Sequence, residues 1–112
     1  MTLKSDRYTY RITWSEEDKE YVGLCVEFPS LSWLAESPNL ALKGIREVIE
    51  KVIKDMNTNG ESPPEPFSSK KFSGKFVVRI PPEIHRNLSM QAKEEGISLN
   101  RLISAKLSRA SR

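Results

Sequence analysis

The segment Lys75–Ile80 (KFVVRI) constrains the fold of this chain more than any other stretch. Phe76, Val78 and Ile80 alternate with the other three residues, which predicts a short β-strand with one apolar face. No further strand pattern follows, so a single chain would leave the backbone N–H and C=O groups of this strand without a ladder partner. Residues 75–110 also fall below the roughly 40 residues at which a lone core usually suffices. The segment therefore predicts that two chains pair these strands antiparallel about a two-fold axis.

Two helices are expected after this strand. Pro81-Pro82 starts the first and Glu95-Gly96 stops it, because glycine readily adopts the left-handed conformation that ends a helix. Ser98 can cap the second. The apolar residues of the strand and the helices would form one core shared by the two chains. We expect that dimer core to contain Phe76, Val78, Ile80, Ile84, Leu88, Leu102 and Ile103.

The first half of the chain predicts a β-β-β-α module. Residues 8–14 alternate cleanly, residues 21–28 are rich in β-formers, and the short polar turn between them makes the pair a hairpin. Residues 31–35 can add a short third strand. Ser37-Pro38 then opens an amphipathic helix that ends at residues 57–60. We expect Trp14 and Cys25 in the core of this module. Because strands and helices occur in separate stretches of the chain, we expect a fold of the α+β class.

The charge is divided unequally between the two halves. Residues 1–58 carry 8 Lys/Arg and 10 Asp/Glu, a net charge of −2, whereas residues 59–112 carry 10 and 5, a net charge of +5. Residues 59–74 are rich in proline, serine and lysine, which predicts a linker. We therefore expect a module at 1–58, a linker at 59–74 and a second module at 75–112. A basic half suits a polyanion, although a basic tail can also serve solubility alone.

The second module resembles the ribbon-helix-helix DNA-binding family, in the strand and proline of residues 75–81 and in Gly96-Ile97-Ser98-Leu99-Asn100. The resemblance implies that the outward strand residues Lys75, Val77 and Arg79 read bases in the major groove. Val77 departs from the commoner polar reader, because it can touch a thymine methyl group but cannot hydrogen-bond a base. The resemblance also implies phosphate contacts at the start of the second helix, to which the linker lysines can add. The implied phosphate-binding residues are Ser98, Leu99, Asn100, Lys70 and Lys71.

The arrangement of both modules resembles the HicB antitoxin family. The residues that carry this resemblance are Tyr21–Pro29, which look like its second strand, and Ser37–Ile53, which match its amphipathic helix. It implies a partial ribonuclease-H-like fold at residues 1–58 that neutralises a HicA-type mRNA-cleaving toxin by binding it. It also implies a dimer that represses its own operon by binding double-stranded operator DNA, with tetramers left open. Pro29–Trp33 departs from the family's Pro-x-x-Gly-Cys type segment, and Trp33 and Leu34 are the candidate toxin contacts.

Two other functional classes remain open from the sequence. The chain could be a free-standing ribbon-helix-helix regulator whose first module senses a ligand or oligomerises, or a degenerate nuclease that retains activity. A nuclease needs several carboxylates converging on divalent metals, and the strands offer only Glu27 and Glu36. The single His85 has no visible nucleophile or orienting partner. We therefore expect no enzyme activity, no cofactor and no metal site.

The N-terminus and the hydropathy pattern bear on where the chain works. No apolar run follows the charges of the first seven residues, so we expect no signal peptide and a cytoplasmic protein. No stretch approaches the roughly 20 apolar residues of a membrane span, so we expect no membrane partner. A single cysteine excludes an internal disulfide and a multi-cysteine zinc site.

Overall fold

The structure is a computed structural model that describes residues 4–111 of the chain. It divides the chain into two compact units between Ser73 and Gly74. Residues 1–3, where the N-terminal stretch considered above begins, and Arg112, the last residue of the expected second module, lie outside the described residues. A short 3₁₀ helix, η1, spans Lys4–Arg7. The two units are described separately below.

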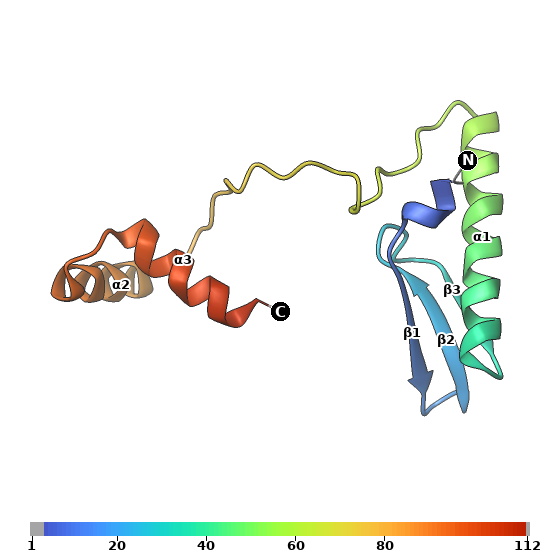
Figure 1. Ribbon diagram of the computed structural model, residues 1–112, viewed down its shortest axis with the longest axis horizontal. Helices are drawn as coiled ribbons and strands as arrows, with labels where there is room; N and C mark the ends of the chain where they lie inside the picture. Colours follow the sequence, from blue (N-terminus) through green and yellow to red (C-terminus); the bar gives the residue numbers. More distant parts are fainter. Residues whose placement is uncertain (1–3, 112) are drawn as a thin grey trace. The chain divides into compact units, whose positions relative to one another are not determined.

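The first unit contains a three-stranded antiparallel sheet in the order β1-β2-β3 (Figure 1). The strands are β1 (Tyr10–Ser15), β2 (Glu20–Cys25) and β3 (Ser32–Ala35). The three expected strands are thus confirmed, although β2 is shorter than the alternation predicted. It ends at Cys25 because the chain turns there, with the N–H of Phe28 donating to the carbonyl of Cys25 at 3.1 Å. The α+β class is confirmed.

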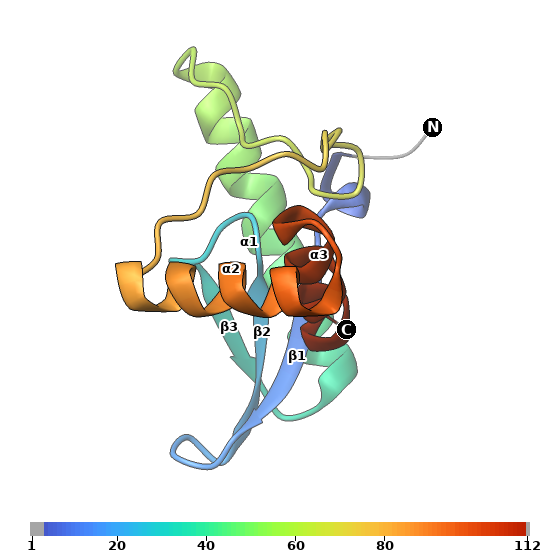
Figure 2. The ribbon, with the colours of Figure 1, turned by 90° about the vertical axis from the view of Figure 1, so that its left-hand side faces the viewer.

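Helix α1 (Pro38–Thr58) packs along one face of this sheet, as Figures 1 and 2 show from two sides. The Ser37 hydroxyl caps it by accepting from the N–H of Leu40 at 3.2 Å, and Pro38 occupies the first turn, as predicted. The buried core lies between helix and sheet. It consists of Tyr8, Cys25, Phe28, Ile45 and Ile49.

Two glycines let the helix approach the sheet closely. A Cβ atom at Gly23 of β2 would lie 2.6 Å from the carbonyl oxygen of Ala41 and 2.9 Å from the Ile45 side chain. A Cβ atom at Gly44 of α1 would overlap the indole of Trp33 on β3. The missing side chain of Gly23 therefore makes space for the backbone of α1, and the missing side chain of Gly44 makes space for the Trp33 indole. Protein interiors are close-packed, so this spacing leaves little room for even one added methyl group.

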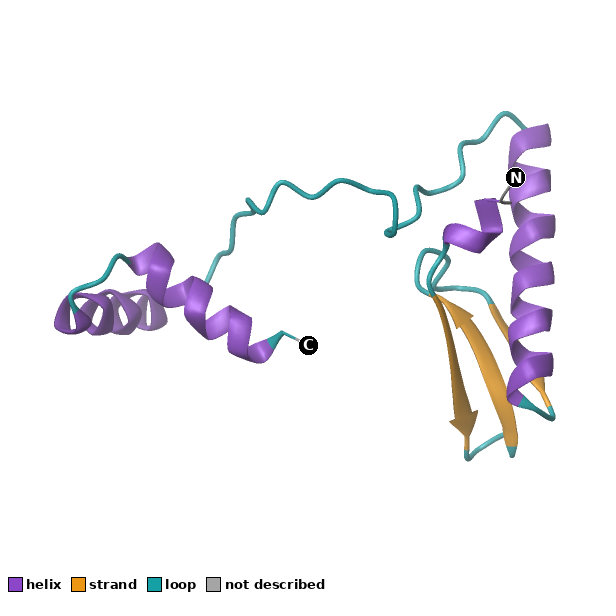
Figure 3. Ribbon diagram, in the orientation of Figure 1, coloured by secondary structure: helices purple, strands orange, loops and turns teal. Residues whose placement is uncertain are grey.

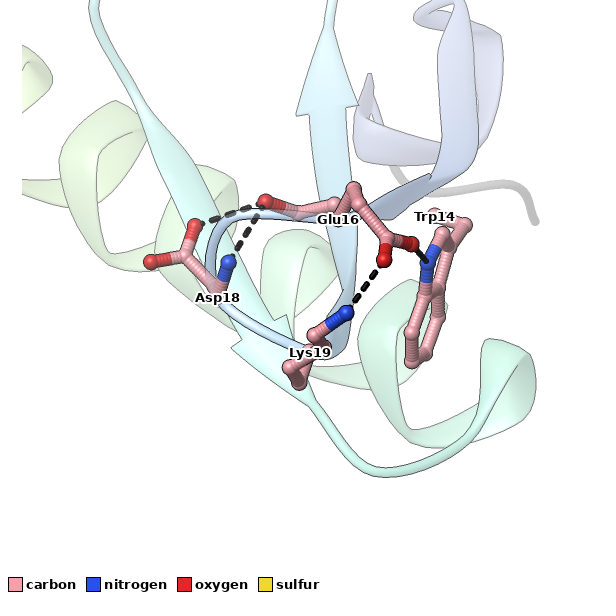
Figure 4. A network of polar contacts seen from close by, with 5 residues as sticks. Trp14, Glu16, Asp18 and Lys19 are labelled. Atoms are coloured by element: carbon pink, nitrogen blue, oxygen red, sulfur yellow. Dashed lines mark hydrogen bonds and ion pairs between the residues drawn. The ribbon is translucent and has the colours of Figure 1, made fainter.

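Trp14 is exposed, so its expected place in the core was wrong. Its indole N–H donates to Glu16 Oε2 at 2.7 Å, and its ring packs edge-on against Tyr21 with the centroids 5.1 Å apart. Lys19 forms an ion pair with Glu16 across the same turn (Figure 4). The Ser15 hydroxyl donates a hydrogen bond to Asp18 Oδ2 at 2.8 Å. Trp14 lies near the end of the hairpin, beyond the part of the sheet where the core residues gather. The alternation placed it on the correct face but could not show where the core stops.

The second unit contains two helices, α2 (Pro82–Glu95) and α3 (Leu99–Ala110). Gly96 ends α2 in the left-handed conformation, with φ at 70°, and Ser98 caps α3, both as predicted. Residues 75–80 form no strand, contrary to the alternation, and lie in the loop that precedes α2 (Figure 3). A strand is defined by hydrogen bonds to a second strand, and nothing within the described residues of this single chain supplies one.

Gly23→Ala tests the close approach of helix and sheet. The new methyl group would press on the backbone of α1, which cannot rotate away, so we expect the free energy of unfolding to fall by about 1–3 kcal/mol. Thr13→Ala, at an exposed position of the same sheet, is the control and should change it by less than about 0.5 kcal/mol. Urea unfolding of both variants measures the difference. Equal stability of the two variants would contradict the proposed packing.

Candidate functional site

The second unit exposes much of its apolar surface. Within the described residues of this unit only Ala92 and Leu102 are buried. Phe76 is 73% exposed, and Val78, Ile80 and Ile84 are also exposed. These last four belong to the expected dimer core, whereas Leu102 is already buried between α2 and α3 in the single chain. Exposed apolar surfaces of this kind are typical of interaction sites.

A groove runs between residues 74–78 and α3. It is lined by Phe76 and Val78 on one side and by Ile103 and Leu107 on the other. Leu107 is itself exposed. The groove therefore joins the apolar side chains of residues 75–80 to the apolar stripe of α3.

The three expected base-reading residues all lie on the exposed segment before α2. Lys75 and Arg79 are exposed, and Val77 is the most exposed of the large apolar side chains, at 91%. A valine that makes so little contact with its own chain contributes nothing to the core of the unit. Its position is therefore consistent with a surface role, and it is flanked by two cations two residues away on either side.

The expected phosphate-binding residues fall into two groups. The hydroxyl of Ser98 accepts from the N–H of Arg101 at 3.1 Å, and Leu99 and Asn100 form the first turn of α3. The N–H groups of a first helical turn have no partner within the helix, which suits an anion. Lys70 and Lys71 belong to the first unit instead, and the Lys70 ammonium lies 5.8 Å and 5.6 Å from the ring centroids of Phe67 and Phe72. These two rings stack, with an interplanar angle of 14°.

Glu27 holds the middle of the expected linker onto the first unit. Its carboxylate accepts from the N–H of Thr9 at 2.9 Å, from the Thr9 hydroxyl at 3.2 Å and from the N–H of Phe67 at 2.9 Å. Two further hydrogen bonds hold the neighbouring residues, and we call the bonded segment 64–68 the strap. The Tyr8 hydroxyl donates to the carbonyl of Pro64 at 2.8 Å, and the Ser68 hydroxyl donates to the carbonyl of Arg7 at 2.6 Å.

These bonds determine the ionisation of Glu27. Burial raises the pKa of its carboxyl group, but hydrogen bonds from the backbone of Thr9 and Phe67 and from the Thr9 hydroxyl favour the charged form and outweigh burial. The net result is a pKa below the ordinary value of 4.5. Sequence reasoning considered Glu27 only as a nuclease carboxylate. Nothing local in the sequence indicates its bond to Phe67, which lies 40 residues away.

The two candidate toxin contacts lie on β3, an edge strand of the sheet. Trp33 is 46% exposed and covers Gly44 on the helix side, whereas Leu34 is 42% exposed and pairs with Val22 on the other side. The structure thus brings the two side chains together on one edge, but on opposite faces. Trp33 is partly a packing residue and partly a surface residue, which is why the sequence alone left its role open.

The chemistry of the remaining candidate groups is limited. Cys25 is buried, and burial raises the pKa of its thiol, so the thiol is protonated at neutral pH. Between Lys4 and Ser111, no three His, Cys, Asp or Glu side chains gather in a way that could hold a metal ion. Within the same range, no helix combines the length and the apolar character that a bilayer crossing requires. His85 is exposed in the first turn of α2.

A family model described as the HicB family matches residues 56–107. The matched part begins near the end of α1, covers the strap and α2, and ends within α3. It therefore covers most of the second unit and omits the sheet. Residues 56–107 of this chain are therefore similar to the HicB family. No curated protein and no solved structure matches the chain.

Release of the strap is the pH-dependent event that this geometry predicts. Folding lowers the pKa of Glu27. The stability that its carboxylate contributes is therefore fully present above the unfolded pKa near 4.5, and is lost as the pH falls through the folded pKa. We expect protection of the Phe67 amide against hydrogen exchange to be lost selectively below pH 4.5. Glu27→Gln should lower that protection already at pH 7, and the exposed Glu61→Gln should not. Unchanged protection of the Phe67 amide in Glu27→Gln at pH 7 would contradict this assignment.

Proposed function

We propose that this chain is a HicB-type antitoxin that neutralises a HicA-type toxin by binding it and represses its own operon as a DNA-bound dimer. The second unit would be a ribbon-helix-helix domain, and the first a partial ribonuclease-H-like module that binds the toxin. One observation carries the proposal: the region that matches the HicB family exposes a row of apolar side chains on the alternating segment 75–80, which forms no strand in the single chain. The chain would act in the cytoplasm without a cofactor or a catalytic site.

Pairing of two segments 75–80 accounts for the exposed apolar surface. In an antiparallel pair, Phe76, Val78 and Ile80 of both chains would face inward onto the four helices. Burying side chains of this size stabilises a protein by roughly 1.5–3 kcal/mol each, and this gain, together with the ladder hydrogen bonds, opposes the cost of ordering the segment. The dimer core would again comprise Phe76, Val78, Ile80, Ile84, Leu88, Leu102 and Ile103.

The same pairing supports DNA recognition. Lys75, Val77 and Arg79 would then point away from the core on a two-stranded ribbon, which fits the width of the major groove. Arg79 can donate two parallel hydrogen bonds to a guanine, and Val77 can contact a thymine methyl group. The first turn of α3, with Ser98, Leu99 and Asn100, would hold phosphates, assisted by Lys70 and Lys71. Residues 74–112 carry 8 Lys/Arg and 3 Asp/Glu, a net charge of +5 that favours a polyanion.

Val78→Glu tests the dimer. Two carboxylates would be buried near the two-fold axis, and an unpaired buried charge costs far more than the valine contributed. We expect the full chain to sediment as a dimer at micromolar concentration and this variant as a monomer. Val77→Glu, one residue away on the opposite face, is the matched control and should remain dimeric. A monomeric parent chain, or a dimeric Val78→Glu variant, would contradict the proposal.

Arg79→Ala tests base reading. One bidentate contact is worth about 1–3 kcal/mol of discrimination and is lost twice in a dimer. We therefore expect at least a tenfold loss of affinity for DNA from upstream of the chain's own gene, with affinity for scrambled DNA nearly unchanged. Arg101→Ala, on α3, should weaken both alike by a small factor. Gel-shift titrations and footprinting measure these changes. An unchanged footprint for Arg79→Ala would refute the assignment.

A further inference from the structure

Strand β3 is a short edge strand of the sheet without a charged residue or a proline. Only β2 pairs with it among the described residues, so its outer row of backbone N–H and C=O groups faces no other strand. Natural edge strands are usually blocked by a lysine, a proline, a bulge or a covering segment. The four residues of β3, Ser-Trp-Leu-Ala, include neither a charge nor a proline. This edge is therefore open to pairing with a further strand.

The side chains of β3 offer apolar contacts on both faces of the sheet. Trp33 lies over Gly44 on the helix face, and Leu34 lies next to Val22 on the opposite face, and both are nearly half exposed. Successive side chains of an added strand also point to opposite faces. A strand on this edge would therefore contact Trp33 with one residue and Leu34 with the next. This is the geometry by which peptides add to sheet edges.

The groove beside β3 is acidic. It lies between the strand and the first part of α1, and its apolar lining includes Trp33 and Leu40, both of which are exposed. The charged residues of its rim are Glu20, Glu36, Glu47 and Lys43. Three carboxylates against one ammonium favour a positively charged occupant. Residues 1–73 as a whole carry 10 Lys/Arg and 12 Asp/Glu, a net charge of −2 of the same sign.

The charge also argues against a second copy of this chain at the same edge. Pairing of two β3 strands about a two-fold axis would bring both acidic rims together, and like charges at an interface oppose association. The same acidic rim would attract a basic strand from a different protein, which raises both its affinity and its association rate.

We infer that the toxin adds a basic strand to the β3 edge, with apolar side chains on Trp33 and Leu34 and cationic side chains facing Glu20, Glu36 and Glu47. This inference rests on the proposed function and adds to it the mode of toxin binding. Backbone hydrogen bonds to β3 would supply affinity, and the acidic rim would supply selectivity for a basic partner.

The test uses the full chain and its proposed HicA-type toxin, purified together and separately. In the complex, hydrogen exchange of residues 32–35 should slow at least tenfold relative to the free chain. Leu34→Lys places a blocking lysine on the edge and should weaken toxin binding at least tenfold. Leu42→Lys, at a position of α1 that is 37% exposed and outside this groove, is the matched control and should change binding less than threefold. Thermal melting verifies that both variants fold.

The possible outcomes separate the two proposals. If no complex forms with the parent chain, the proposed function fails and this inference fails with it. If a complex forms while residues 32–35 exchange as fast as in the free chain, or if Leu34→Lys binds as tightly as Leu42→Lys, toxin binding stands and the β3 edge is not its site. Protection of residues 32–35 that rises with the concentration of this chain alone would assign the edge to a second copy and overturn the inference.

Discussion

The proposed function of the second unit depends on one constraint, its exposed apolar surface. Two helices bury only Ala92 and Leu102, whereas Phe76, Val78, Ile80 and Ile84 remain in contact with solvent. The hydrophobic effect disfavours such a surface, and the backbone of residues 75–80 gains ladder hydrogen bonds only from another strand. A second chain meets both requirements in one step. In the proposed dimer, the surface that reads DNA exists only because the inward side chains are covered.

The two units carry opposite net charges, and this separates their proposed partners. The basic second unit suits DNA, and the acidic first unit suits a basic protein. The strap at residues 64–68 belongs to the chain segment that precedes the second unit. Its bonds to Glu27, Tyr8 and Arg7 hold the middle of the expected linker on the first unit. Residues 64–68 are therefore part of the first unit, although the composition of residues 59–74 predicts a linker.

Local close packing positions the proposed toxin-binding edge. Gly23 and Gly44 allow α1 to lie near the sheet, and Trp33 covers Gly44 while keeping nearly half of its surface exposed. The strand that carries Trp33 is therefore supported from one side by the helix and remains open along its edge. A rigid and uncovered edge is suited to backbone recognition, because little conformational entropy is lost when a partner binds.

The sequence by itself determined the features that depend on neighbouring residues. The hairpin, the cap at Ser37, the break at Gly96 and the faces of each strand follow from alternation, helical periodicity and the conformations that proline and glycine allow. The tertiary structure alone decided that Trp14 is exposed, that Gly23 contacts α1 and that Glu27 binds Phe67. These features join segments about 18 to 40 residues apart or depend on where the core ends. Periodicity assigns a residue to a face, but only the packing of one element on another decides whether that face is covered at that point.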